Sequence, residues 1–222
     1  MELTNQEEEI ARLKDELAEA KLQIERAYLE NIETLRYAVE VRNPYTRGHS
    51  ERVSKYAVLI GEKLNLSDEQ LRILRIGGLF HDIGKIGTPD SILLKDSKLT
   101  DEEYAKIKRH PTIGTEILSN SEVFKDILPI VKHHHERYDG KGYPDQLKGE
   151  EIPLLARITS VADSFDAMSS RRTYRDKLEI SNIIDEIEKN KGTQFDPEMA
   201  DAFIEILKDN FEKIKEIQES YL

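Results

Sequence analysis

Six histidines lie between residues 49 and 135 of this 222-residue chain, in or beside predicted helices. They are His49, His81, His110, His133, His134 and His135. A single histidine is more often a surface or hydrogen-bonded residue than a ligand, but several of these stand close to acidic residues. The chain has no cysteine, which excludes disulfides and thiolate metal sites. Because imidazole and carboxylate groups suit Fe, Mn, Mg or a sulfur-free zinc site, the sequence predicts a metal centre built from His and Asp.

The pair His81-Asp82 is the most informative part of this pattern. It ends an apolar stretch at residues 71–80 and precedes Ile83-Gly84-Lys85. An imidazole and a carboxylate are costly to bury without partners, and the two oxygens of one carboxylate can bridge two cations. Lys85 would lie about one turn away, where its ammonium could meet a phosphate oxygen. The alternative is that Asp82 caps a helix or pairs with Lys85.

Two acids in a later, largely apolar segment extend the predicted site. Asp163 and Asp166 are three residues apart, so on a helix they face the same side. A metal is favoured over a salt bridge for Asp163. Asp166 is expected to accept the free N–H of a ligand histidine, as carboxylates behind metal ligands usually do.

Of the three consecutive histidines at 133–135, two are expected to be metal ligands and one is not. His134 and His135 diverge by about 100° on a regular helix, so both reach one ion only near a helix end. His133 is expected to lie at the surface or behind the ligands.

A series of short motifs runs through the chain in a fixed order. It comprises Gly48-His49-Ser50, His81-Asp82-Ile83-Gly84-Lys85, His110-Pro111, His134-His135-Glu136, Asp139-Gly140-Lys141-Gly142-Tyr143-Pro144, Val161-Ala162-Asp163-Ser164-Phe165-Asp166, Arg172-Thr173-Tyr174-Arg175 and Gly192-Thr193-Gln194-Phe195-Asp196-Pro197. Together these motifs resemble the HD superfamily of metal-dependent phosphohydrolases, specifically its HD-GYP branch, over about residues 31–210. The resemblance implies an all-α HD domain that hydrolyses cyclic di-GMP to pGpG, or onward to GMP.

The resemblance also implies a role for individual residues. One metal would be held by His49, His81, Asp82 and Asp163. A second would be held by His110, His134 and His135, with Asp82 bridging the two. Lys85 would contact the scissile phosphate, Tyr143 would shape the pocket, and Arg172 and Arg175 would bind the ligand. Asp82 and Lys85 are thus the predicted catalytic residues.

The number and kind of metal ions also follow from the resemblance. Family members commonly bind iron or manganese, and some have a glutamate four residues before the first histidine and bind a third ion. Tyr45 occupies that position here, so two divalent ions and pGpG as product are expected. Two ions could generate a nucleophile from water near neutral pH and hold the phosphoryl oxygens.

Three other functions compete with this interpretation. A different nucleotide phosphohydrolase of the HD superfamily is disfavoured by the Gly-Tyr-Pro loop. A non-hydrolytic sensor or scaffold that binds a cyclic dinucleotide and acts through protein partners would show degenerate ligands, and the ligand set is complete. A sensor with slow turnover and tight binding stays open as an alternative. A helical interaction protein with incidental histidines would not carry the full series of motifs.

Helices are predicted to position all of these residues. Ser67-Asp68-Glu69-Gln70 and Thr100-Asp101-Glu102-Glu103 are capping boxes, while Pro111, Pro129, Pro153 and Pro197 stand where helices can begin. Residues 138–145 contain two glycines and a proline, so they form a loop. Residues 92–94 are interpreted as an apolar loop rather than a strand. The predicted fold is therefore all-α.

Residues 1–30 are predicted to form a separate helix, ahead of a phosphohydrolase domain at 31–222. Ile10, Leu13, Leu17, Ala20, Ile24 and Ala27 recur at alternating steps of three and four. This pattern favours a parallel coiled coil that makes the chain a homodimer, over a single helix leaning on its own domain. It also resembles a signalling linker, with an upstream sensor or receiver domain as partner.

Charge and hydropathy limit the remaining possibilities. The net charge of −11 disfavours binding to a nucleic-acid polymer but not to a small anionic substrate. The chain has no apolar run of the roughly 20 residues that span a bilayer and no signal peptide. A soluble, cytoplasmic protein is therefore expected.

Overall fold

The computed structural model describes residues 2–40, 48–170 and 179–220. Helices account for all the regular elements of these ranges apart from one isolated bridge between Lys191 and Phe195, so the predicted all-α class is confirmed. The chain divides into two compact units, Met1–Ala38 and Val39–Leu222. Within the described ranges, no helix is both long and apolar enough to cross a membrane.

The first unit is formed by α1 (Glu2–Glu40) apart from the last two residues of this helix. Its sequence has no glycine or proline, and charged residues of both signs surround the heptad positions. Ile10, Leu13, Leu17 and Ile24 are each at least half exposed. The coiled coil and the boundary after residue 30 stay predictions.

The core of the second unit is built from its longer helices. These are α2 (His49–Lys63), α3 (Asp68–Phe80), α8 (Leu154–Ser169), α9 (Ile180–Lys189), α10 (Pro197–Asp209) and α11 (Phe211–Glu219). α2 packs against α3, α8, α10 and α11. At its centre Tyr56, Phe165 and Phe203 are buried and meet edge to face or tilted, with centroids 4.9–6.2 Å apart. Burial of three aromatic rings fixes α2, α8 and α10 relative to one another.

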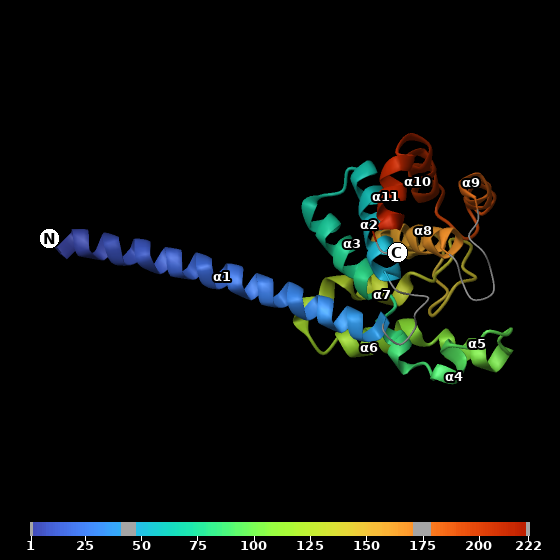
Figure 1. The fold of residues 1–222 in the computed structure, drawn as a ribbon, viewed down its shortest axis with the longest axis horizontal. Coiled ribbons are helices and arrows are strands. Elements are labelled where there is room, and N and C mark those ends of the chain that lie inside the picture. The colour runs from blue at the N-terminus through green and yellow to red at the C-terminus, as the bar shows by residue number, and fades with distance from the viewer. Residues whose placement is uncertain (1, 41–47, 171–178, 221–222) are drawn as a thin grey trace. The chain divides into compact units, whose positions relative to one another are not determined.

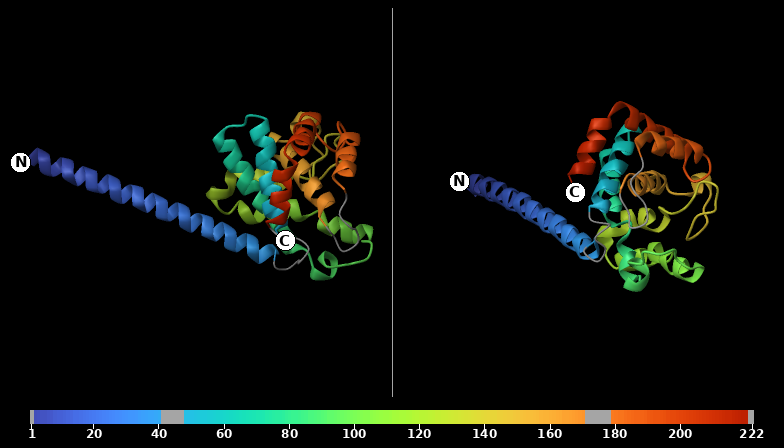
Figure 2. Two further views of the ribbon diagram at one scale, coloured as in Figure 1. Left: turned by 45° about the horizontal axis from the view of Figure 1, so that its top comes forward. Right: turned by 45° about the vertical axis from the view of Figure 1, so that its right-hand side comes forward.

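Shorter elements complete this unit. They are the 3₁₀ turns η2 (Ile83–Gly87), η3 (Glu122–Ile127) and η4 (Gly149–Glu151), and the helices α4 (Asp90–Leu93), α5 (Asp101–Ile107), α6 (His110–Leu118) and α7 (Leu128–His133). Residues 92–94, expected as a loop, fall on α4 and its end, because Pro89 precedes a single helical turn that buries Ile92. Figures 1 and 2 show α4 and α5 on one side of the unit and α10 and α11 on the other.

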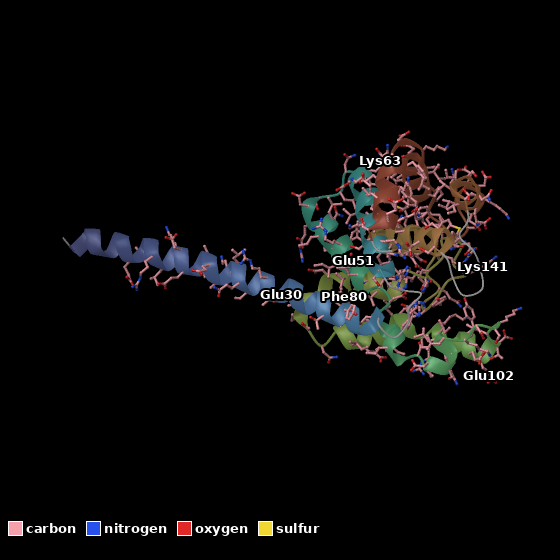
Figure 3. All side chains as sticks on the ribbon, in the orientation of Figure 1. Glu30, Glu51, Lys63, Phe80, Glu102 and Lys141 are labelled. Carbon is pink, nitrogen blue, oxygen red and sulfur yellow. The ribbon has the colours of Figure 1, made fainter. Side chains whose placement is uncertain are left out.

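The predicted helix starts are confirmed. Ser67 and Thr100 each accept the backbone N–H three residues on, and both capping boxes are complete. Asp196 caps α10, and prolines stand at or beside the starts of α6, α7, α8 and α10. In Figure 3, Phe80 at the end of α3 lies inside the unit, whereas Lys63 and Glu102 lie at its surface. The inner end of α3 is where the predicted site begins.

Candidate metal centre

The predicted ligands come together where several helices begin or end. His49 is the first residue of α2, His110 is the first residue of α6, and His81 follows the last residue of α3. α7 ends at His133, so His134 and His135 lie just beyond it, and their ring centroids are 4.1 Å apart. Because side chains at helix ends can converge without a clash between whole helices, four buried imidazoles and the half-buried imidazole of His135 share one region.

Asp82 lies between two groups of donor atoms, and each of its oxygens faces one group. Oδ1 is 3.2 Å from His110 Nε2 and 4.0 Å from His134 Nε2. One donor atom from each of Asp82, His110, His134 and His135 lies within 4.8 Å of the others. This first group therefore has the size and composition of a metal site.

The second group faces the other oxygen of the same carboxylate. Asp82 Oδ2 is 3.4 Å from His81 Nε2 and 3.6 Å from His49 Nε2. Asp163 Oδ1 adds a further donor, 3.4 Å from His49 Nε2 and 3.9 Å from His81 Nε2. The two groups meet only at Asp82, so this carboxylate is placed to bridge two cations.

Three of the histidines are oriented by the backbone of their own helical turn. The Nδ1 atom of His81 lies 2.7 Å from the carbonyl oxygen of Gly78, and that of His110 lies 2.8 Å from Ile107 O. His134 Nδ1 lies 3.0 Å from Val131 O. A carbonyl can only accept, so each Nδ1 carries a proton, and in the neutral imidazole each Nε2 then carries a lone pair. All three lone pairs point toward the centre.

These lone pairs are poorly satisfied by the protein alone. His81 Nε2 and Asp82 Oδ1 are buried without a hydrogen-bond partner among the described residues. His110 Nε2 and His134 Nε2 are 3.3 Å apart, and with both protons on Nδ1 no hydrogen can lie between them. Buried acceptors that face one another are destabilising unless a cation lies between them. The donor set therefore fits divalent metal ions.

His49 is oriented by a side chain instead. Its Nδ1 donates to Asp166 Oδ2 at 2.7 Å, and Arg52 Nε donates to Asp166 Oδ1 at 2.7 Å. Asp166 thus accepts the N–H of His49, the kind of contact that the sequence predicted for this carboxylate. Arg52, one turn after His49, was missed, although its spacing places it on the same face of α2.

Burial controls the protonation of the first group. It lowers the pKa of His134 well below its ordinary value, and the neighbouring histidines lower it further. Burial likewise lowers the pKa of His135 to about 3. Both rings are therefore neutral near pH 7, which is the form that binds a metal.

The carboxylates control protonation in the second group. Burial lowers the pKa of His49, but hydrogen bonds to Asp163, Asp166 and Asp82 outweigh it and raise the pKa well above its ordinary value. Burial raises the pKa of Asp163, yet the hydrogen bond from His49 and nearby imidazole charge bring it well below the usual range. Because a ligand must be neutral, a cation at this position would displace the proton of His49.

Lys85 reaches the site from η2. Its ammonium is paired with Asp82 Oδ2, which is the salt bridge that the sequence left as an alternative. Burial raises the pKa of Asp82, but the Lys85 ammonium and the neighbouring imidazoles reverse this and hold the pKa well below its ordinary value. The pairing uses only Oδ2, and Oδ1 still faces His110 and His134.

The loop at residues 138–145 folds back onto the histidines. Tyr143 N donates to His135 O at 3.2 Å, and the Tyr143 ring centroid is 4.9 Å from that of His135. A Cβ at Gly142 would lie 2.3 Å from Arg137 N, so only glycine permits this approach. Tyr143 therefore forms one wall of the site.

Two further segments hold the loop in place. Glu136 Oε1 accepts the N–H of Asp145 at 2.7 Å, and this carboxylate is buried. Asp139 N donates to Thr193 O at 2.8 Å, and Arg137 Nη1 donates to Gln194 Oε1. The motif at 192–197 thus supports the loop. In the sequence Glu136 is only one member of a motif, and its contact with the 145 amide depends on the fold.

Of the remaining predictions, the one for His133 can be compared with the structure, and those for Arg172, Arg175 and Tyr45 cannot. His133 lies outside both groups, with Nδ1 3.8 Å from an Asp145 oxygen, as expected of a residue that is not a ligand. Arg172, Arg175 and Tyr45 lie outside the described residues. Their predicted roles, and the absence of a third metal, stay predictions.

Comparison with known proteins places the chain in a family. Residues 33–199 match the family model described as HD domain. The chain belongs to the HD domain family. RpfG of Xanthomonas campestris, a cyclic di-GMP phosphodiesterase response regulator, is 42% identical to this HD domain chain. The match covers 86% of this chain and 51% of RpfG. A cyclic di-GMP phosphodiesterase of Thermotoga maritima is also 42% identical, over 81% of this chain and 50% of the relative.

The fold of this HD domain is shared with a solved structure. A cyclic GMP-AMP specific phosphodiesterase of Vibrio cholerae superposes with a TM-score of 0.65 and 20% identity, over 87% of this chain and 55% of that one. These findings confirm the resemblance that the motifs indicate. The chain spans about half the length of the curated relatives it matches.

Proposed function

We propose that this HD domain is a metal-dependent phosphodiesterase that hydrolyses a cyclic dinucleotide, with cyclic di-GMP as substrate. The observation that carries the proposal is the position of Asp82 between two groups of inward-facing donors. The relatives named above, which act on cyclic di-GMP or cyclic GMP-AMP, support the substrate class. The ligands proposed are His49, His81, Asp82 and Asp163 for one ion, and Asp82, His110, His134 and His135 for the other.

Iron or manganese is the proposed metal. The donors are imidazole nitrogens and carboxylate oxygens, and without thiolates such a set suits these divalent ions. When bound, the ions supply positive charge and a nucleophile generated from water at neutral pH.

The chain's own residues supply orientation and charge. The Lys85 ammonium, held at Asp82, is positioned to donate to a non-bridging oxygen of the scissile phosphate. The carbonyls of Gly78, Ile107 and Val131 keep Nε2 of three ligands free of protons. Tyr143 excludes solvent from the side of His135 and His110.

The product proposed is pGpG. This rests on Tyr45, which stands where related enzymes that bind a third ion have glutamate. Arg172 and Arg175 are proposed to bind the second phosphate or a guanine edge, since a planar guanidinium suits either group.

The test uses chain purified without oxygen, with its metals quantified and its products separated by chromatography after addition of Mn(II) or Fe(II). We expect about two ions per chain and conversion of cyclic di-GMP to pGpG. Asp82→Ala should lose both metal and turnover, because it removes the ligand that the two groups share. His133→Ala is the matched control, since this histidine lies next to His134 but outside both groups.

Each alternative outcome has a distinct meaning. Full metal content and turnover in Asp82→Ala would refute the ligand assignment. Three ions with accumulation of GMP would show that Tyr45 is a poor guide to the product. Bound metal without turnover would favour a cyclic-dinucleotide sensor.

We further propose that residues 1–30 are a linker helix that pairs with the same helix of a second chain. With Ile10 and Leu17 at heptad position a, Glu9 and Glu16 fall at g, and Lys14 and Lys21 fall at e. In a parallel pair, each g residue faces the e residue five positions later in the partner, so Glu9 meets Lys14 and Glu16 meets Lys21. An antiparallel pair would place like charges together, so the charges favour the parallel arrangement.

Light scattering of the full chain would test this pairing. We expect a dimer, weakened when Lys14 and Lys21 are both changed to Glu. Mixing that variant with one in which Glu9 and Glu16 are both changed to Lys should restore a mixed dimer. Asp15→Lys is the control, because residue 15 falls at the outward position f. A monomeric parent chain would refute the pairing.

A further inference from the structure

Lys108 is a half-buried cation beside the candidate metal centre that has no role in the assignments above. It caps the C-terminal end of α5, two residues before His110. Its Nζ lies 4.7 Å from the centroid of the Tyr104 ring and 5.8 Å from the centroid of the Tyr143 ring. An ammonium at these distances is attracted to the faces of aromatic rings. Lys108 is therefore held in one region instead of sampling solvent freely.

Tyr143 connects this lysine to the metal ligands. Its ring centroid is 4.9 Å from that of His135 and 6.5 Å from that of His110. Lys108 thus lies one aromatic ring away from the ligand histidines.

The ammonium of Lys108 remains available to an anion. None of the described carboxylates lies within salt-bridge distance of it. The acid of α5 closest to it in sequence, Glu103, is instead paired with Lys95, with an N–O distance of 2.7 Å. Lys85, the other described lysine at the site, is paired with Asp82. A lysine has three donors, and contact with two rings uses none of them fully.

A cyclic dinucleotide carries two phosphates in one ring, and only one of them can be cleaved at the metal centre at a time. The second lies one nucleotide away from the cleaved phosphate, and Lys108 is a cation beside the wall that Tyr143 forms. We propose that Lys108 binds the phosphate that is not being cleaved, with Tyr104 and Tyr143 positioning its ammonium. Lys108 is then a specificity residue that distinguishes a dinucleotide from a simple phosphodiester. The inference rests on the proposed function and names a contact for the far half of its substrate.

The experiment compares Lys108→Met and Lys108→Arg with the parent chain, loaded with Mn(II). Lys106→Met is the matched control, because Lys106 is an exposed lysine of the same helix. Turnover is measured with cyclic di-GMP and with bis(p-nitrophenyl) phosphate, which has one phosphate and no base. Dissociation constants for cyclic di-GMP and GMP are measured by calorimetry.

For cyclic di-GMP, we expect Lys108→Met to raise KM and Kd by about tenfold or more, the effect of losing a hydrogen bond to a charged group. The change in kcat should stay within about twofold. Hydrolysis of the single-phosphate diester, and binding of GMP, should be unchanged. Lys108→Arg should retain most of the affinity, because it keeps the charge.

Two results would overturn the assignment. One is Lys108→Met with the same KM and Kd for cyclic di-GMP as Lys106→Met. The other is an equal loss on both substrates, which would place Lys108 in the metal centre or in the fold. If the parent chain binds cyclic di-GMP without cleaving it, the proposed activity fails and the Kd comparison still decides the role of Lys108. If it does not bind cyclic di-GMP at all, both proposals fail.

Discussion

Gly84 allows η2 to pack closely against α6. Replacing it with alanine should disrupt the candidate metal centre, although Gly84 is not a ligand. An added Cβ would lie 1.9 Å from His110 O and 2.5 Å from Gly114 N, and both atoms belong to the backbone. Side-chain rotation cannot relieve such an overlap. The two elements would have to separate by about 1.5 Å to restore ordinary van der Waals contact.

The size of the effect follows from this geometry. Overpacking typically costs about 1–3 kcal/mol, and a clash between backbones belongs at the upper end. For a domain of this size, each kcal/mol corresponds to about 2–4 °C in Tm, so about 6–12 °C is expected for Gly84→Ala. The shift would also carry His110 away from Asp82 Oδ1, now 3.2 Å distant. Since metal ligands tolerate only about 0.2 Å of error, the ion at the first group should be lost.

Circular dichroism melting and metal analysis after dialysis measure the two effects. Gly87→Ala is the control within the same 3₁₀ turn, because there a Cβ would meet only the flexible side chain of Ile113 at 3.0–3.2 Å. That variant should stay within about 1 kcal/mol of the parent chain. A Gly84→Ala protein with parental Tm and metal content would refute the view that close packing of η2 on α6 sets the position of His110.

Three further results are expected. Asp166→Asn leaves the buried charge of Arg52 without its partner and loosens His49. The free energy of unfolding should therefore fall by about 3–5 kcal/mol, and metal affinity should fall by about 10–100-fold. Unchanged urea unfolding and metal titration would contradict this. Glu136→Ala should speed hydrogen exchange at the 145 amide and release the Tyr143 loop without loss of metal, whereas parental exchange rates would show that other contacts suffice. In metal-free protein, His135 keeps a pKa of about 3 while an unfolded histidine titrates near 6.5. The unfolded state therefore binds more protons in this window, stability should fall from pH 6.5 to 5, and His135→Asn should reduce that slope in urea unfolding.

The sequence was a good guide to the helices, because helix starts depend on local patterns, whereas the ligand roles of the histidines and aspartates stay predictions. Capping boxes and prolines mark helix starts through bonds within one turn, and each was found where expected. Asp163 and Asp166 share a face because of helical spacing alone. The short apolar segment at 92–94 was misjudged, since a single helical turn carries too few residues to show a period.

Contacts between distant segments could not be read in this way. Arg52 supports Asp166 across more than a hundred residues, and Lys108 meets Tyr143 only once α5 and the loop are in place. The division of Asp82 between two groups is also a property of the assembled fold. The sequence shows that a carboxylate has two oxygens, but not which histidines each one faces.

The way the histidines are oriented has a consequence for how such a site can change over generations. His81, His110 and His134 are aligned by carbonyls in their own turns, and a carbonyl survives every substitution of the residue that carries it. His49 depends on the side chain of Asp166, which a single codon change can remove. Mutational drift that spares the ligands themselves can therefore weaken one ion position and leave the other nearly intact. If the two groups hold one ion each, a lineage that loses a single carboxylate behind a ligand would be expected to lose the ion at His49 first.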